Sequence, residues 1–210
     1  MEEMKGKKVL MCRHAKTNGG DGPKKDCLSE EGIKDALAFV YPEGLYPVTR
    51  VQSSCIARTY TTAGLILNAN GSVRVTALPS NQAWGDFGHL KRAFGWDLQK
   101  LGELLKKSSN CAAAFKTFGT PEQIQILKKE LLTALMDVFA ELHDGEAGLV
   151  VSHMPFFELL CEAVVGLKAE TNCPELGWVI FSQFVEGGPI IITGSSFLNL
   201  DKTQILMTQG

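Results

Sequence analysis

Short apolar runs alternate along this chain with segments of helical spacing, and this alternation limits the possible folds more than any other feature. Strands that alternate with helices pack as a largely parallel sheet with helices on both faces. A length of 210 residues is enough to build one substantial core. We therefore predict a single α/β domain over residues 1–210 with a three-layer α/β/α architecture. Its strands are expected at 8–12, 50–53, 73–77, 149–152, 179–185 and 190–193.

Two of the predicted helices carry clear start signals. Ser29 can cap a helix whose first turn contains Glu30 and Glu31, where the helix dipole favours negative charge. The tetrapeptide at 120–123 is a capping box with proline at the first helical position, and the apolar stripe behind it ends near Gly145. The other helices are expected at 57–67, 98–106 and 155–165.

The segment 79–119 interrupts this alternation and is interpreted as an insertion over one end of the sheet. It contains several glycines and the large aromatic residues Trp84, Phe87, Phe94 and Trp96, among others. Two interpretations remain open. The insertion is either a lid over a site, or a peripheral loop whose aromatic side chains pack on the body of the domain.

Composition and charge exclude several classes of function. The formal net charge of −2 gives no electrostatic basis for binding nucleic acid. The first residues lack the apolar segment of a secretory signal, and no apolar run is long enough to span a bilayer. We therefore expect a cytoplasmic protein with no nucleic-acid or membrane partner. Its six cysteines form no CxxC pair, so reduced thiols are expected in place of a disulfide framework or a zinc site.

Polar side chains follow three of the predicted strands at their carboxyl ends. Arg13 and His14 come directly after the first strand, and His153 comes directly after the fourth. Arg58 falls on the first turn of the helix that follows the second strand. In open α/β sheets, ligands bind at the carboxyl ends of the strands. If these strands are neighbours, two arginines and two histidines meet at one edge of the sheet.

This combination of residue types suits the chemistry of phosphoryl groups. Arginine offers a planar fork of donors that binds phosphate bidentately and stays charged at any working pH. Helix N-termini behind Arg58 and after His153 add backbone donors. Only a neutral imidazole among these groups can act as a nucleophile, and two nearby guanidinium groups favour its neutral form by lowering its pKa. A covalent phosphohistidine would then divide one difficult step into two easier ones.

Motifs of competing chemistries are missing from the sequence. No cysteine is followed six residues later by arginine, and the chain has no G-x-x-x-x-G-K-[ST] or G-x-S-x-G motif. The first strand is not followed by G-x-G-x-x-G. The sequence therefore disfavours a cysteine phosphatase, a P-loop nucleotidase, a serine hydrolase and a dinucleotide-binding enzyme.

Four short motifs occur in order along most of the chain. They are Arg13-His14-Ala15-Lys16-Thr17, Leu28-Ser29-Glu30-Glu31-Gly32, Ser53-Ser54 with Arg58 and Thr62-Ala63, and Val151-Ser152-His153. In turn they resemble the RHG-type signature, the L-[ST]-x-x-G helix start, the S-S-x-x-x-R-x-x-x-T-A segment and the V-x-S-H segment of the histidine phosphatase (phosphoglycerate mutase-like) superfamily, branch 1. Each motif alone is weak, whereas the four together are specific.

The resemblance implies a role for each residue at the strand ends. His14 would be the nucleophile that becomes phosphorylated. Arg13, Arg58 and His153 would bind the phosphoryl group and neutralise its charge. No metal ion and no other cofactor would be required.

Three further residues are candidates for substrate binding. The resemblance places Thr17 and Asn18 along the wall of the pocket. Met154-Pro155 follows the second histidine where glycine is usual, and this pair resembles the H-x-P variant of the small phosphohistidine phosphatases. Met154 is the third candidate for that reason.

The proton donor to the leaving group is the part of the family pattern that this sequence lacks. The larger branch usually places a glutamate shortly after the third strand in an L-x-E context, whereas Ser80 occupies the nearest equivalent position here. Asp86 is the only carboxylate close by, so it is the candidate general acid, and a solvated loop carboxylate is the alternative interpretation. Protonation of an alcohol leaving group contributes a factor of about 10²–10⁴ in rate.

We expect a metal-independent phosphatase that hydrolyses a phosphomonoester through phosphohistidine on His14. A phosphohistidine or phosphoprotein phosphatase is the first alternative, because an imidazole leaving group needs less help from an acid. A phosphoglycerate-type mutase and a phosphate-binding pseudoenzyme are further alternatives, and Ser80 in place of the acid supports the pseudoenzyme. The expected partner is a small phosphorylated substrate, which a lid would suit, or a phosphoprotein. Neither the natural substrate nor the oligomeric state follows from the sequence.

Overall fold

A mixed six-stranded sheet forms the centre of the computed structural model, which describes residues 6–19, 26–45, 47–72, 74–166 and 172–198. The strand order is β3-β2-β4-β1-β5-β6. In the described ranges the strands are β1 (Lys7–Arg13), β2 (Val48–Ser53), β3 (Thr76–Ala77), β4 (Ala147–Ser152), β5 (Trp178–Gln183) and β6 (Ile191–Ser195).

The sheet is parallel over β3, β2, β4 and β1, and antiparallel over β5 and β6. The last two strands pair antiparallel with each other, and Gly187-Gly188 in the connection between them is a hairpin signal in the sequence. In the parallel half, Arg13 at the end of β1 lies opposite Ser152, and Ser53 at the end of β2 lies opposite Val151. The three central strands therefore end level with one another, at the same edge of the sheet.

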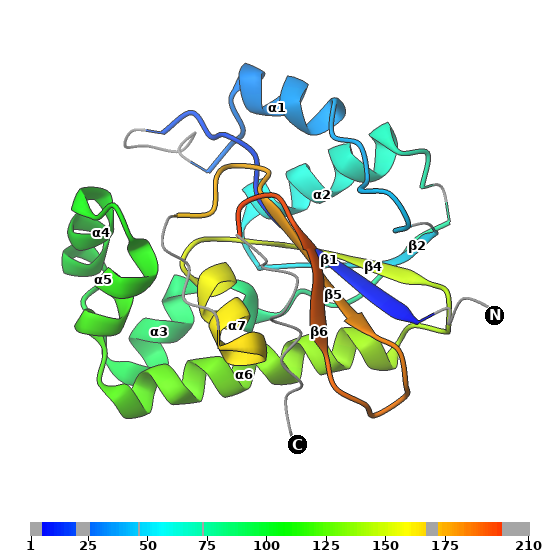
Figure 1. The fold of residues 1–210 in the computed structure, drawn as a ribbon. Coiled ribbons are helices and arrows are strands. Elements are labelled where there is room, and N and C mark those ends of the chain that lie inside the picture. The colour runs from blue at the N-terminus through cyan, green and yellow to red at the C-terminus, as the bar shows by residue number, and fades with distance from the viewer. Residues whose placement is uncertain (1–5, 20–25, 46, 73, 167–171, 199–210) are drawn as a thin grey trace.

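Helices cover both faces of the sheet, as the three-layer prediction requires (Figure 1). Helices α1 (Glu30–Leu37) and α2 (Ala57–Ala69) lie on one side, and α6 (Pro121–Ala140) and α7 (Phe156–Val165) lie on the other. Alternate residues of β1 face the two layers. Leu10 and Cys12 join the core under α2, whereas Val9 and Met11 join the core under α6 and α7. None of the helices in the described ranges is both long and apolar enough to cross a membrane.

Helix starts follow the capping signals closely. The Ser29 hydroxyl accepts a hydrogen bond from the Gly32 amide at 3.0 Å, and Thr120 and Gln123 form the predicted capping box of α6. The predicted end of α6 is wrong, because the helix stops at Ala140 and not near Gly145. Leu142 continues the apolar stripe and is buried, but it lies in the turn that leads into β4. The apolar stripe continues past the end of the helix to Leu142, and for this reason the predicted helix was too long.

The insertion contains more helix than was predicted. It consists of η1 (Gln82–Trp84), α3 (Phe87–Phe94), α4 (Leu98–Lys107) and α5 (Cys111–Phe118). Aromatic contacts attach it to α7, since the ring of Phe156 lies 5.4 Å from Phe87 and 5.6 Å from Phe115 between centroids. Trp96 packs in turn on Phe115 at 4.9 Å. The insertion thus shares the core of the domain, while its movement as a lid stays a prediction.

Candidate active site

Three neighbouring strands bring the predicted site together at their carboxyl ends. His14 follows β1, His153 follows β4, and Ser54 follows β2. Backbone hydrogen bonds hold these ends side by side, from the His14 amide to the Ser152 carbonyl at 3.1 Å and from the Ser54 amide to the Val151 carbonyl at 3.3 Å. The two histidine rings lie 5.0 Å apart between centroids, and both are buried.

One ring nitrogen of His14 is committed to the backbone. Its Nδ1 lies 2.7 Å from the Ala15 carbonyl oxygen. Because a carbonyl only accepts, Nδ1 carries the hydrogen, and in the neutral ring Nε2 keeps a free lone pair. The Ala15 amide donates to the Thr62 hydroxyl at 3.1 Å, which holds the loop in place. The ring is therefore fixed with Nε2 as its only possible nucleophile.

The neutral form of His14 is strongly favoured. The pKa of His14 is lowered from 6.5 to about 4, with burial as the largest cause and the charges of Arg58 and Arg13 acting in the same direction. The hydrogen bond to the Ala15 carbonyl acts in the opposite direction, because it stabilises the imidazolium. At neutral pH the lone pair on Nε2 is therefore available.

This shift makes a testable prediction about pH. The His14 ring should titrate with a midpoint near pH 4, and the nucleophile should be lost only as the pH falls through that value. We would follow the ring by NMR from pH 3 to 8, because the second ionisation of a phosphate near pH 6 would obscure a rate profile. A midpoint at or above 6.5 would show that the ring is not buried between the arginines.

His153 is bound through both ring nitrogens. Its Nδ1 accepts a hydrogen bond from Arg58 Nε at 3.3 Å, and its Nε2 lies 2.7 Å from the Ser54 hydroxyl oxygen. Burial is the largest cause that lowers the pKa of His153 well below 6.5, and the Arg58 charge adds to it. Like His14, this ring is neutral at physiological pH.

Two guanidinium groups border the histidines. Arg58, at the start of α2, forms an ion pair with Asp26 in addition to its contact with His153. Arg13 donates through Nη1 to the Cys173 carbonyl at 2.6 Å, and its buried Nε has no hydrogen-bond partner among the described residues. The Cys173 amide donates in turn to the buried carboxylate of Glu158 at 2.9 Å. The Cys173 carbonyl thus positions Arg13 directly, and Glu158 positions it indirectly by binding the Cys173 amide.

The arrangement matches what a tetrahedral oxyanion needs. Two guanidinium groups supply fixed positive charge and bidentate donors, and a neutral imidazole supplies a lone pair between them. Over the described part of the chain, no three histidine, cysteine, aspartate or glutamate side chains gather as a set that could hold a metal ion. The chemistry that this site can perform is nucleophilic attack by His14 on a bound phosphoryl group.

Comparison with known protein families shows which family the chain belongs to. Residues 9–175 match the model of the histidine phosphatase superfamily, branch 1. The chain belongs to this superfamily. The match confirms the resemblance that the four motifs indicated. It covers most of the chain and is to branch 1 of the superfamily.

Solved structures share the histidine phosphatase fold with this chain. YhfR from Bacillus stearothermophilus is 15% identical, with a TM-score of 0.58 over 89% of this chain and 95% of its own. A mycobacterial glucosyl-3-phosphoglycerate phosphatase, solved with VO₃, is 16% identical, with a TM-score of 0.56 over 92% and 99%. A putative phosphohistidine phosphatase SixA from Agrobacterium tumefaciens is 15% identical, with a TM-score of 0.52 over 90% and 96%. No curated protein gives a significant sequence match.

The three predicted substrate-binding residues lie in the two loops that contain His14 and His153. Thr17 forms an isolated β-bridge with Leu28, and the Asn18 amide side chain donates to the Leu28 carbonyl at 3.2 Å. Met154 directly follows His153, and its partly buried side chain packs against the core. Substrate contact by Thr17, Asn18 and Met154 stays a prediction.

The Asp86 carboxylate is engaged by its own helix. It caps α3 by accepting from the Gly88 amide at 2.8 Å, and it accepts from Arg92 Nη2, also at 2.8 Å. Its neighbour Gly85 approaches the site directly, since a Cβ at that position would lie 2.5 Å from His153 Cδ2. Asp86 therefore directly follows a residue that contacts His153, but its carboxylate interacts with the N-terminus of α3 and with Arg92. The role of Asp86 as general acid stays a prediction.

Ser54 and Asp26 contact the site residues, and sequence reasoning assigned neither of them a role. Ser54 lies in a recognised motif, but only the folded chain shows that its hydroxyl meets His153. Asp26 directly precedes Cys27 and the Leu28 motif, and no spacing rule connects its carboxylate with Arg58. Both contacts depend on loops that bring distant segments together, so a local pattern carries no signal for them.

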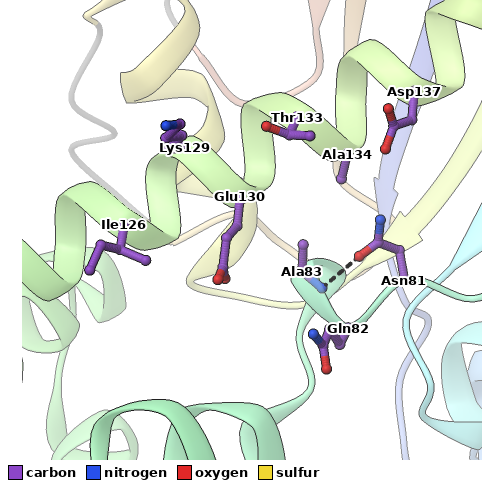
Figure 2. Close-up of a pocket in the computed structure, with 9 residues that line it drawn as sticks. All are labelled: Asn81, Gln82, Ala83, Ile126, Lys129, Glu130, Thr133, Ala134 and Asp137. Atoms are coloured by element: carbon purple, nitrogen blue, oxygen red, sulfur yellow. Dashed lines mark hydrogen bonds between the residues drawn. The ribbon is translucent and has the colours of Figure 1, made fainter.

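A separate pocket lies between η1 and α6, on the insertion side of the sheet (Figure 2). Its volume is about 460 Å³, and its lining mixes charged, polar and apolar groups. Glu130 points from α6 toward η1, and its carboxylate also lies 3.1 Å from His89 Nε2. The lining residues are Asn81, Gln82, Ala83, Ile126, Lys129, Glu130, Thr133, Ala134 and Asp137. None of the residues that line this pocket belongs to the candidate active site.

Proposed function

We propose that this protein is a metal-independent phosphatase that hydrolyses a phosphomonoester through a phosphohistidine on His14. The observation that carries the proposal is the hydrogen bond between His14 Nδ1 and the Ala15 carbonyl. That bond leaves Nε2 as an unprotonated nucleophile beside two guanidinium groups. A histidine that served only to bind phosphate would present an N–H to the ligand and not a lone pair.

The proposed reaction has two displacements at phosphorus. The lone pair of His14 Nε2 forms an N–P bond while the P–O bond to the alcohol breaks, and the alcohol oxygen takes up a proton as it leaves. Water then attacks phosphorus, the N–P bond breaks, and the electron pair returns to Nε2 while water loses a proton. Arg13 and Arg58 neutralise charge on the equatorial oxygens in both steps.

A phosphoramidate substrate, such as phosphohistidine in a protein, is the second candidate. The observation that favours it is the commitment of the Asp86 carboxylate to the α3 cap and to Arg92. General acid catalysis contributes about 10²–10⁴ for a poor leaving group, and an imidazole leaving group needs less of it. A site without a free acid would thus discriminate in favour of P–N bonds.

Replacement of Asp86 by asparagine distinguishes these candidates. Asparagine retains the helix cap, since its side-chain oxygen can still accept from the Gly88 amide. If Asp86 is the general acid, Asp86→Asn should slow an alkyl phosphate far more than an activated aryl phosphate, whereas a carboxylate that serves only the α3 cap and Arg92 should give a similar factor for both. The matched control is Asp97→Asn, which alters the corresponding cap of α4. A loss on the alkyl phosphate that is about 10²–10⁴ greater would identify Asp86 as the general acid.

The proposed function is tested by phosphate release from para-nitrophenyl phosphate in EDTA, together with acid- and base-quench trapping of the phosphoenzyme. Phosphohistidine is labile in acid and stable in base, so the quench identifies the linkage. Turnover in EDTA with a base-stable phosphoenzyme supports the proposal. A protein that binds phosphate without forming a phosphoenzyme would instead be a binding-only descendant of the fold.

A further inference from the structure

The hydrogen bonds around His153 determine which nitrogen carries its proton. Arg58 Nε can only donate, and it points at His153 Nδ1 from 3.3 Å. Nδ1 therefore holds a lone pair. Burial and the neighbouring Arg58, His14 and Arg13 keep the pKa of His153 low, so the ring is neutral and its single hydrogen lies on Nε2.

The hydrogen on Nε2 leads into a buried chain of hydroxyl groups. The Ser54 hydroxyl oxygen, 2.7 Å away, accepts from Nε2. Its own hydrogen then points to the Thr59 hydroxyl oxygen at 3.0 Å, and Thr59 donates to the Ile56 carbonyl at 2.7 Å. Ser54 and Thr59 are both inaccessible to solvent. Every donor in this chain has an acceptor, and Thr59 has the Ser54 carbonyl at 3.2 Å as a second one, so the arrangement is complete in the free protein.

A bound phosphoryl group requires the opposite arrangement at Nδ1. Phosphoryl oxygens only accept hydrogen bonds, and Arg58 must direct its donors toward them. The nitrogen of His153 that borders Arg58 is Nδ1. A lone pair there would repel the incoming oxygens, whereas an N–H would bind them. The ring therefore needs its hydrogen on Nδ1 when the site is occupied.

We propose that the Ser54 hydroxyl is a positioning group that allows His153 to move its ring hydrogen from Nε2 to Nδ1 when a phosphoryl group binds. In the occupied state Ser54 donates to Nε2, and the Thr59 hydroxyl turns from the Ile56 carbonyl to donate to Ser54. The Ile56 amide, 3.3 Å from the Ser54 oxygen, donates to it in both states. Nδ1 first takes up a proton from the substrate or solvent, and Nε2 then releases its own proton when the contact with Ser54 opens, so one proton enters, one leaves and the ring ends neutral.

A hydroxyl is the side-chain group that suits both states. It donates and accepts, and rotation about one bond exchanges the two roles without moving a heavy atom. Alanine would leave Nε2 without a partner in a buried site, where an unsatisfied polar group is costly. The inference rests on the proposed function, because only an oxyanion in the pocket demands the hydrogen on Nδ1.

Nitrogen NMR tests the inference directly. The chain has four histidines, so long-range ¹H–¹⁵N spectra can be assigned to single rings by substitution of each. In the free protein we expect the protonated nitrogen of His153 to be Nε2. On addition of orthovanadate we expect it to be Nδ1, together with a change in the His14 signals. Free protein with the hydrogen on Nδ1 would overturn the inference.

The two possible failures give different spectra. If vanadate moves the His14 signals while His153 keeps its hydrogen on Nε2, then the pocket binds an oxyanion and the exchange alone is wrong. If vanadate moves neither ring, then the pocket does not bind a tetrahedral oxyanion, and the proposed function fails together with the exchange.

Substitutions supply the kinetic readout. Ser54→Ala should lower kcat by about 10- to 100-fold, the range expected for one unpaired buried polar group, and should leave His153 unable to hold Nδ1–H with vanadate. Thr59→Val should cause a smaller loss that Thr59→Ser restores. The matched control is Ser182→Ala, which removes a buried serine hydroxyl that pairs at 2.7 Å with the hydroxyl of the exposed Thr193 on β6. Equal losses in Ser54→Ala and Ser182→Ala, or wild-type vanadate spectra in Ser54→Ala, would overturn the role of Ser54.

Discussion

Replacement of His14 by alanine is expected to abolish the phosphoenzyme and to lower the turnover of para-nitrophenyl phosphate in EDTA by more than about 10³-fold. The His14 imidazole presents a fixed lone pair on Nε2, because its Nδ1–H is held by the Ala15 carbonyl. Alanine leaves the strand end and the two arginines in place. The variant should therefore still bind vanadate while it fails to turn over substrate.

His143→Ala is the matched control, because His143 is exposed in the turn after α6. It should retain wild-type turnover and a wild-type yield of phosphoenzyme. Retained turnover in His14→Ala would remove His14 as the nucleophile, whatever the pocket binds. Inactivity of the wild-type protein toward aryl phosphates, with a trapped phosphoenzyme from a phosphohistidine donor, would instead select the second candidate substrate.

The strand ends were predictable because each one is a local pattern. An apolar run followed by Arg13-His14, and another followed by His153, required only that consecutive strands of an α/β sheet end at one edge. The pairing of β1, β4 and β2 then placed the residues together. The parallel centre of the sheet follows from the same alternation of strands and helices.

The hydrogen-bond partners of His153 and of Asp86 were not predictable in this way. The partner of each His153 nitrogen depends on how the residue after β2 and the first turn of α2 pack against the ring, which no spacing along the chain encodes. Asp86 shows a different limitation. An aspartate directly before a helix start is a capping signal, and α3 begins at the next residue. Helix α3 was not expected from the sequence, so the sequence could not tell whether Asp86 caps a helix or presents a free carboxylate.

Replacement of Arg58 by alanine is the second change with a large expected effect. Its guanidinium reaches the pocket from the first turn of α2, and it is the donor that holds His153 Nδ1. Loss of a preorganised donor from such a site costs about 10²–10³ in rate. We therefore expect kcat/KM to fall by about that factor and vanadate to bind more weakly. Arg58→Lys should recover little, because a single ammonium cannot replace a bidentate fork.

The Asp26 ion pair allows the two contributions of Arg58 to be separated. Asp26→Asn removes the carboxylate that holds one end of the guanidinium but leaves its charge in the pocket. We expect this variant to raise KM more than it lowers kcat, whereas Arg58→Ala affects both. Arg74→Ala, at an exposed arginine before β3, is the control and should behave as wild type. Wild-type kinetics and vanadate affinity in Arg58→Ala would place the guanidinium outside the phosphoryl site, and the ion pair with Asp26 would then be its structural role.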